Sequence, residues 1–242
     1  NSHNNRLLIH NIKKILKVNI IRHERSSWVY SFGRYIPYPF QASLSFLPPK
    51  IAAECLKGFI KADQKFLSEK NINFLSWINN SFGSGIARNF MVPYNKKFWR
   101  FPLNKINCEW VDSFIPRPAL SQVLEDYFAQ GRHRFGYNSS FWYPDKSGIN
   151  QLPQAFEKQV CNINKSCLVS AIDLKKKELI IGGKSRENFD ILISTIPLPE
   201  LTRIARFVPK GILKMFALLR WNSIFNINLG LRGICQAEKH WV

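Results

Sequence analysis

Motifs that hold metals or bind phosphates are missing from this sequence of 242 residues. Its five cysteines form no CxxC pair, and its five histidines stand at no ligand spacing from them. There is no HExxH, no phosphate-binding loop and no Ser-His-Asp order. These absences argue against a bound metal and leave no catalytic side chain of the usual kind. The cysteines are predicted to be reduced, mostly buried thiols; they are Cys55, Cys108, Cys161, Cys167 and Cys235.

Long hydrophobic runs are also missing. No apolar segment approaches the ~18 residues of a membrane-spanning helix, and no signal peptide precedes the first helical pattern. We therefore predict a cytoplasmic protein without a membrane partner. The sequence begins at Asn1 and ends on an apolar dipeptide without a turn signal, so we interpret it as an interior piece of a longer protein. It is compatible with a homo-oligomer.

Acidic residues are scarce, with 16 against 35 lysines and arginines, which gives a net charge of +19. One interpretation is an anionic partner, and the other is a solvated, lysine-rich surface. The basic residues are scattered in short runs such as "LKKKEL" and "GRHRF" and form no arginine-rich helix. We therefore predict no nucleic-acid partner, and a diphosphate ligand would need only one or two of these charges.

What the sequence does have is enough apolar and aromatic residues, 45% and 14%, to fill a sizeable core. Apolar spacing and proline and glycine signals predict helices at 6–17, from Pro48 and Pro49 to about 63, at 73–92 with a break at Gly83 to Gly85, and from Pro118 to Gly131. Alternation predicts hairpins around Gly33 and over 167–183, a buried strand at 189–195 and a long strand at 217–232. The fold class is therefore α+β, with a mainly helical block before the strands.

Four stretches place glutamine or asparagine beside aromatic residues: 37–41, 90–99, 135–144 and 219–232. Aromatic rings can stack on the face of a planar heterocycle while amides, which offer both a donor and an acceptor, bond to its edge. In "PYPFQ" (37–41) the prolines restrict the backbone, so that Tyr38 and Gln41 would be presented with little ordering cost. The alternative is that these aromatics form the core and the amides cap turns.

The residue sequences of these and neighbouring stretches resemble those of a known protein family. "GRYIPYPFQASLSFLP", "FMVPYNKKFW", "GYNSSFWYPDKSGI" and "DILISTIPLPEL" resemble UDP-galactopyranose mutases of the eukaryotic type and the related FAD-dependent amine oxidase and protoporphyrinogen oxidase-like flavoproteins. The similarity runs from about residue 25 to 242. It implies an α/β flavoprotein with a helical substrate domain inserted into a Rossmann-like FAD domain, whose dinucleotide fingerprint would precede Asn1.

The resemblance also implies a domain plan and a site. Residues 1–34 would lead from the FAD domain into the substrate domain, 35–150 would be the helical substrate-binding domain, 151–210 FAD-domain strands and 211–242 part of a substrate-domain sheet. Val169 and Gly148, the latter in place of one of a glycine pair, would contact FAD. The family's substrate contacts would fall on Tyr38, Phe40, Gln41, Met91, Asn95, Trp99, Asn138, Trp221 and Arg232.

The function implied is the interconversion of pyranose and furanose forms of a UDP-sugar, with reduced FAD as the nucleophile and the protein supplying position and electrostatics. One position departs from the family, because Phe114 stands where a second diphosphate-binding arginine is expected, with Arg117 three residues further on. This departure keeps two alternatives open. One is an FAD-dependent oxidoreductase of the amine or protoporphyrinogen oxidase type, and the other is a non-catalytic fragment.

Overall fold

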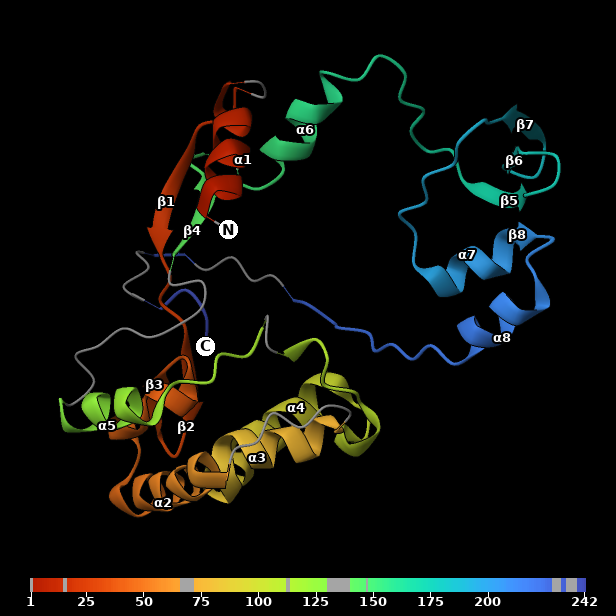
Figure 1. The fold of residues 1–242 in the computed structure, drawn as a ribbon. Coiled ribbons are helices and arrows are strands. Elements are labelled where there is room, and N and C mark those ends of the chain that lie inside the picture. Colours follow the sequence, from red (N-terminus) through yellow and green to blue (C-terminus); the bar gives the residue numbers. More distant parts are fainter. Residues whose placement is uncertain are drawn as a thin grey trace. The chain divides into compact units, whose positions relative to one another are not determined.

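The computed structural model describes residues 2–14, 17–65, 72–111, 114–129, 140–146, 148–227, 232–233 and 239–242 (Figure 1). It contains both helices and strands, which confirms the α+β class. The chain forms two compact units. We call Asn1–Gln151 with Ile227–Val242 the helical unit, and Leu152–Asn226 the sheet unit.

The elements of the helical unit follow the predicted order, with some additions. Its helices are α1 (Ser2–Lys14), α2 (Pro49–Lys65), α3 (Phe74–Ile86), α4 (Val92–Trp99) and α5 (Leu120–Phe128), and α6 (Gln151–Glu157) begins at the boundary and lies in the sheet unit from Leu152 on. Short turns are η1 (Phe40–Ala42), η2 (Leu44–Phe46), the π-helical η3 (Ala87–Met91) and η4 (Leu103–Lys105). Its strands are β1 (Ile20–Glu24), β2 (Trp28–Ser31), β3 (Arg34–Pro37) and β4 (Ser140–Pro144).

Two antiparallel pairs organise the strands of this unit. β2 and β3 form the predicted hairpin, which turns through Phe32 and Gly33, both with positive φ. β1 pairs with β4 from Ile20 opposite Pro144 to Glu24 opposite Ser140, a pairing that local patterns did not predict. The chain also returns to the hairpin near its end, where Trp28 N–H donates to the Trp241 carbonyl at 2.9 Å.

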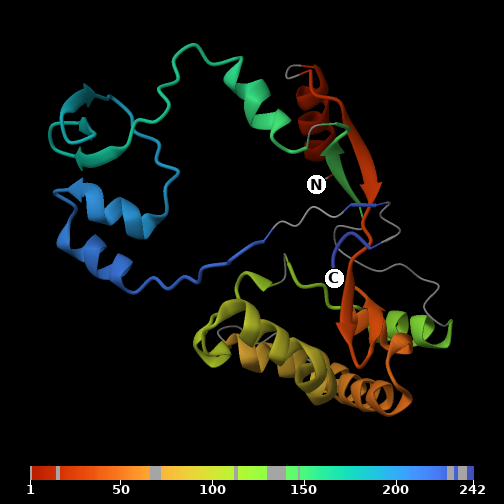
Figure 2. The same ribbon diagram turned by 180° about the vertical axis from the view of Figure 1, so that it is seen from behind.

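Helices α2 and α3 pack against each other (Figures 1 and 2), and glycines lie at their contact. A Cβ atom at Gly83 would lie 2.0 Å from the Gly58 carbonyl oxygen, and one at Gly85 would lie 2.4 Å from that of Glu54. The backbones therefore approach more closely than any larger residue allows. Gly83, at φ 72° and ψ 170°, also interrupts α3, so the predicted break in this helix is confirmed.

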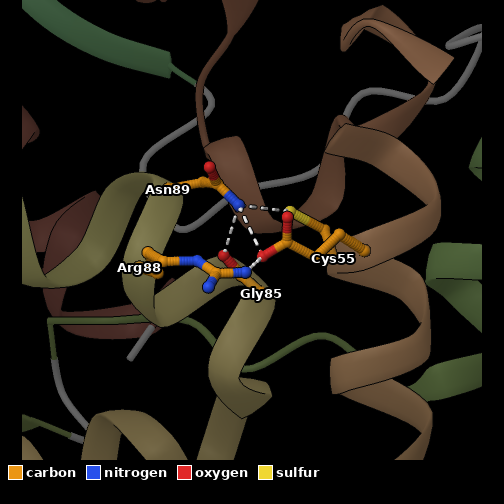
Figure 3. A network of polar contacts seen from close by, with 5 residues as sticks. Cys55, Gly85, Arg88 and Asn89 are labelled. Carbon is orange, nitrogen blue, oxygen red and sulfur yellow. Dashed lines mark hydrogen bonds and ion pairs between the residues drawn. The ribbon is translucent and has the colours of Figure 1, made fainter. Parts of the chain in front are cut away.

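Polar side chains join the same two helices next to the glycines (Figure 3). Asn89 Nδ2 donates to the Gly85 carbonyl at 2.9 Å and lies within 3.4 Å of Glu54 Oε1. Arg88 forms an ion pair with the same Glu54 carboxylate. The neighbouring Cys55 is fully buried, and burial raises the pKa of its thiol to about 11. This cysteine is thus a neutral core residue.

Within the helical unit, a hydrophobic core includes residues of the hairpin, α2, α3 and α5. Its largest fully buried side chains include Phe40, Phe59, Phe74 and Phe82. Asn73 begins α3 by accepting a hydrogen bond from the Ser76 N–H at 3.0 Å, a standard N-cap.

The sheet unit is built on a small four-stranded sheet of order β7-β6-β5-β8. β5 (Val169–Asp173) and β6 (Glu178–Ile181) form the hairpin predicted over 167–183, and Asp173 Oδ1 accepts from the N–H groups of Lys175 and Lys176 in its turn. The remaining elements are β7 (Ser185–Asn188), α7 (Leu198–Ile204), β8 (Ala205–Arg206) and α8 (Lys210–Ala217).

Two strand predictions are wrong in this unit. Residues 189–195 form no strand, and Ile191 and Ile193 are 84% and 85% exposed. Residues 218–227 are irregular after α8, where a strand was predicted over 217–232. Within the described residues no strand pairs with either segment, and β propensity becomes structure only against a neighbouring strand.

The cysteine prediction holds only in part. Cys55 is buried as predicted, but Cys161 and Cys167 are exposed, because they lie in the irregular segment between α6 and β5 where little packs around them. Cys235 lies outside the described residues. None of the described helices combines the length and apolar character that crossing a bilayer requires.

Candidate functional site

A cavity of about 360 Å³ opens beside helix α4 in the helical unit. Its walls come from three stretches that are far apart in the sequence: the end of the hairpin, the continuous run of η3 and α4, and the segment before α5. The residues that line it are Tyr38, Gln41, Phe90, Met91, Tyr94, Asn95, Phe98, Trp99, Trp110, Phe114 and Ile115.

The segment "PYPFQ" supplies the first wall. Tyr38 and Gln41 line the cavity, whereas Phe40 is fully buried and stacks on Phe90 with ring centroids 4.5 Å apart. Phe40 therefore supports the wall from behind. Burial raises the pKa of the Tyr38 hydroxyl, as does nearby Tyr94, while Arg25 acts in the opposite direction. Tyr38 thus stays a neutral hydroxyl at physiological pH.

Gln41 is the most unusual polar group of the site, since only 2% of it is exposed. Its Nε2 donates to the Pro116 carbonyl at 2.9 Å. Its Oε1 is buried without a hydrogen-bond partner among the described residues. A buried acceptor without a partner costs roughly 1–3 kcal/mol, so this oxygen is a candidate to receive an N–H from a ligand.

The second wall is one face of the η3–α4 run. Met91, Asn95 and Trp99 are spaced by four residues and therefore lie on the same side of the helix. Asn95 Nδ2 donates to the Met91 carbonyl at 2.8 Å, which fixes this amide inside the helix. Trp99 Nε1 is buried and has no acceptor among the described residues, and Trp99 is one of the residues that line the cavity.

The walls are completed by aromatic residues that are not among the substrate contacts implied by the family resemblance. Phe90, Tyr94 and Phe98 stack in succession along the helix, with centroids 5.2 and 6.2 Å apart. Trp110 packs against Trp99 at 5.3 Å. The spacing of four residues from 90 to 98 was visible in the sequence and could have identified the first three. Trp110 could not be found this way, because only the tertiary fold brings it to α4.

The third wall holds the position where an arginine was expected. Phe114 lines the cavity and is 61% exposed. Arg117 does not replace the missing cation there, because its Nη2 donates to Asp63 at 2.6 Å and its Nε to the Ser81 carbonyl at 3.2 Å. The lining contains no charged side chain among the described residues.

The remaining predicted site residues lie elsewhere or outside the described part. Asn138 falls outside the described residues. Arg232 belongs to the helical unit and is exposed, and it does not line the cavity. Trp221, 65% exposed, and Val169, at the start of β5, belong to the sheet unit. Gly148 has a φ of +70° and lies beside the Tyr143 hydroxyl.

No family model matches the sequence. The structure is similar to the crystal structure of a reduced UDP-galactopyranose mutase, with a TM-score of 0.76 and 27% identity, over 86% of this chain and 46% of that chain. It also resembles a protein from Pyrococcus furiosus with a TM-score of 0.50, 15% identity and coverages of 88% and 49%.

These similarities show a fold like that of UDP-galactopyranose mutase. At 15% identity, the likeness to the Pyrococcus furiosus protein concerns the fold alone. The chain spans about half the length of each of these two solved structures.

Proposed function

We propose that this chain is part of a flavin-dependent enzyme that isomerises a UDP-sugar between its pyranose and furanose forms. The observation that carries the proposal is the cavity beside α4. Tyr38, Gln41, Met91, Asn95 and Trp99, which match the family's nucleoside contacts, line this one space in a fold similar to that of a mutase.

The chemistry of the walls suits the edge and face of a nucleobase. A uracil-type ring carries one N–H between two carbonyl groups, so the buried Gln41 Oε1 offers an acceptor and the buried Trp99 Nε1 offers a donor. The rings of Tyr94, Phe98 and Trp110 provide stacking surface around it. These residues would bind and orient the nucleoside, exclude water from it and leave the sugar to be positioned beyond the cavity.

Two of the described segments have backbone features that suit contact with a flavin nucleotide. Gly148 has the left-handed backbone that lets a ligand approach closely, and the register of β5 shifts between Val169 and Ala171. Each is a position at which, by the family resemblance, the backbone would contact FAD. When bound and reduced, FAD supplies the nucleophile that the side chains of this site lack.

The proposal is tested on the full-length protein. It predicts turnover of UDP-galactofuranose after reduction with dithionite, without oxygen consumption. Oxygen uptake with an amine or a porphyrinogen, and no turnover of the sugar nucleotide, would refute it.

Individual contacts are tested by ligand binding. Arg232→Ala is expected to raise the dissociation constant for UDP by about tenfold, equivalent to ~1.4 kcal/mol, because it removes a charge-assisted contact to the diphosphate. An unchanged constant would remove Arg232 from the site. Trp99→Ala is expected to weaken UDP binding by a similar factor, and thermal melts must show that the fold survives, since Trp99 also packs on Trp110.

A second function is favoured by one observation, the uncharged wall at Phe114. An FAD-dependent oxidoreductase of the amine or protoporphyrinogen oxidase type could place an apolar aromatic substrate against this ring. The wall of Phe114, Ile115 and Trp110 is apolar and offers a diphosphate no counter-charge. The oxygen-uptake assay distinguishes the two functions.

A further inference from the structure

The segment that forms the third wall, residues 114–118, is anchored to both helices of the glycine-packed pair. The Arg117 guanidinium donates to Asp63 of α2 and to the Ser81 carbonyl of α3. It also lies 5.8 Å from the centroid of the buried Phe59 ring. The side chains of Arg117 and Asp63 are only 23% and 30% exposed, so their interaction is less screened by solvent than that of a surface pair.

The residues on either side of this anchor belong to the cavity. Phe114 and Ile115 line it, and the carbonyl of Pro116 accepts the hydrogen bond from Gln41 Nε2. Arg117 follows Pro116 directly. The carbonyl that accepts from Gln41 is thus separated by a single peptide bond from a residue that is tied to α2 and α3.

The Pro116 carbonyl determines which end of the Gln41 amide can bond to a ligand. A carbonyl oxygen can only accept, so the group facing Pro116 must be the NH₂ group of Gln41. The Oε1 atom is then the end that has no partner among the described residues. If the carbonyl moved away, the amide would be free to rotate and would present either a donor or an acceptor.

We propose that Arg117 is a positioning residue: through Asp63 and Pro116 it holds Gln41 with its oxygen as the acceptor, and so makes the cavity selective for a ring that carries an N–H. This inference rests on the proposed function, since it concerns the same nucleobase cavity. It assigns to Arg117 a role that is distinct from binding the diphosphate.

The test compares two probes on the full-length protein by isothermal titration calorimetry: UDP, and UDP methylated at N3 of the uracil. The methylated ring cannot donate to Oε1. The wild type is expected to bind UDP at least tenfold more tightly than the methylated form, and Arg117→Met should reduce this ratio to about threefold or less. Asp63→Asn, which keeps a side chain of the same size, should reduce it in the same direction.

The matched control is Arg203→Met, which removes a solvent-exposed ion pair with Glu200 in the sheet unit. It should leave the ratio unchanged. A merely structural role of Arg117 would weaken both probes equally. A wild-type ratio that persists in Arg117→Met and in Asp63→Asn therefore overturns the inference.

A second readout separates this inference from the proposed function. If the wild type binds neither probe, the proposed nucleotide site is wrong. Hydrogen exchange then tests, without a ligand, whether Arg117 holds its segment in place. The backbone amides of residues 40–46 and those of Phe114, Ile115 and residue 117 should exchange at least tenfold faster in Arg117→Met than in the wild type or in Arg203→Met. Unchanged exchange in these two segments overturns the positioning role.

Discussion

The two units use similar apolar side chains with opposite results. In the helical unit, Phe59, Phe74 and Phe82 are fully buried between helices that touch through glycine. In the sheet unit, the buried residues are Ala155, Ala171, Ile172, Asp173 and Ile180. Large apolar side chains such as Ile191, Ile193 and Phe225 are 84–89% exposed there. Burial is thus decided by which neighbours the fold supplies, and hydrophobic character alone does not determine it.

The largest expected difference between the units comes from removing one apolar side chain in each. Phe82→Ala should lower the free energy of unfolding by about 3–5 kcal/mol, because Phe82 is fully buried against Trp77 and truncation leaves a cavity. Ile193→Ala should change it by less than about 0.5 kcal/mol, since Ile193 is 85% exposed. Urea unfolding followed by circular dichroism measures both. Equal effects would contradict the contrast.

Glycine substitutions should change stability in opposite directions. Gly85→Ala should cost about 3 kcal/mol, because the new Cβ would meet the Glu54 carbonyl oxygen at 2.4 Å on a rigid backbone. Gly211→Ala in α8 has open space around it and should stabilise its helix by roughly 0.5–1 kcal/mol. The same urea experiment applies, and a neutral Gly85→Ala would show that the helices can separate at little cost.

A smaller effect should come from adding the charge that the cavity wall lacks. Phe114→Arg should tighten UDP binding by about tenfold and leave uridine binding unchanged, because a guanidinium there could bond the diphosphate. Phe114 is 61% exposed, so the arginine is accommodated. Phe128→Arg is the matched control, since Phe128 is also exposed but lies on α5 away from the cavity. Tighter binding in both variants would indicate a general charge effect.

The last contrast between the units depends on pH and concerns the thiols. Burial raises the pKa of Cys55 to about 11 from its ordinary 9.0, so the folded state keeps a proton that the unfolded state releases. This contribution to stability is complete below pH 9 and is lost as the pH rises through 11. Cys55→Ala should flatten the fall in stability over this window, whereas Cys161→Ala, at an exposed position of the sheet unit, should not. Urea midpoints at intervals from pH 8.5 to 11 measure it.

The predictable part of the fold was the part that local sequence determines. Proline and glycine signals placed the start of α2, the β2–β3 turn and the break in α3 correctly, because each depends on a few adjacent residues. The β1–β4 pair was missed because its partners lie more than a hundred residues apart. Residues 189–195 were assigned wrongly because an apolar run has the same pattern whether or not a neighbouring strand exists.

In the site, too, local motifs were predictable and contacts between distant segments were not. The motifs pointed to Tyr38, Gln41, Asn95 and Trp99, and the fold brings these residues to one cavity, while their binding roles stay predictions. The sequence did not show that Gln41 would keep an unpaired oxygen, nor that Arg117 would be held by Asp63. Both depend on contacts between segments that only the tertiary structure brings together.

The return of the chain to its first hairpin has a consequence for biosynthesis. Residues 240 and 241 hydrogen-bond to Ser26 and Trp28, so the helical unit is interrupted by the whole of the sheet unit. A ribosome must add about 90 residues after Gln151 before Trp241 exists, which takes roughly 5–20 s at ordinary elongation rates. Throughout that interval the edge of β2 lacks its closing partner, and nascent chains would expose it to chaperones or to one another.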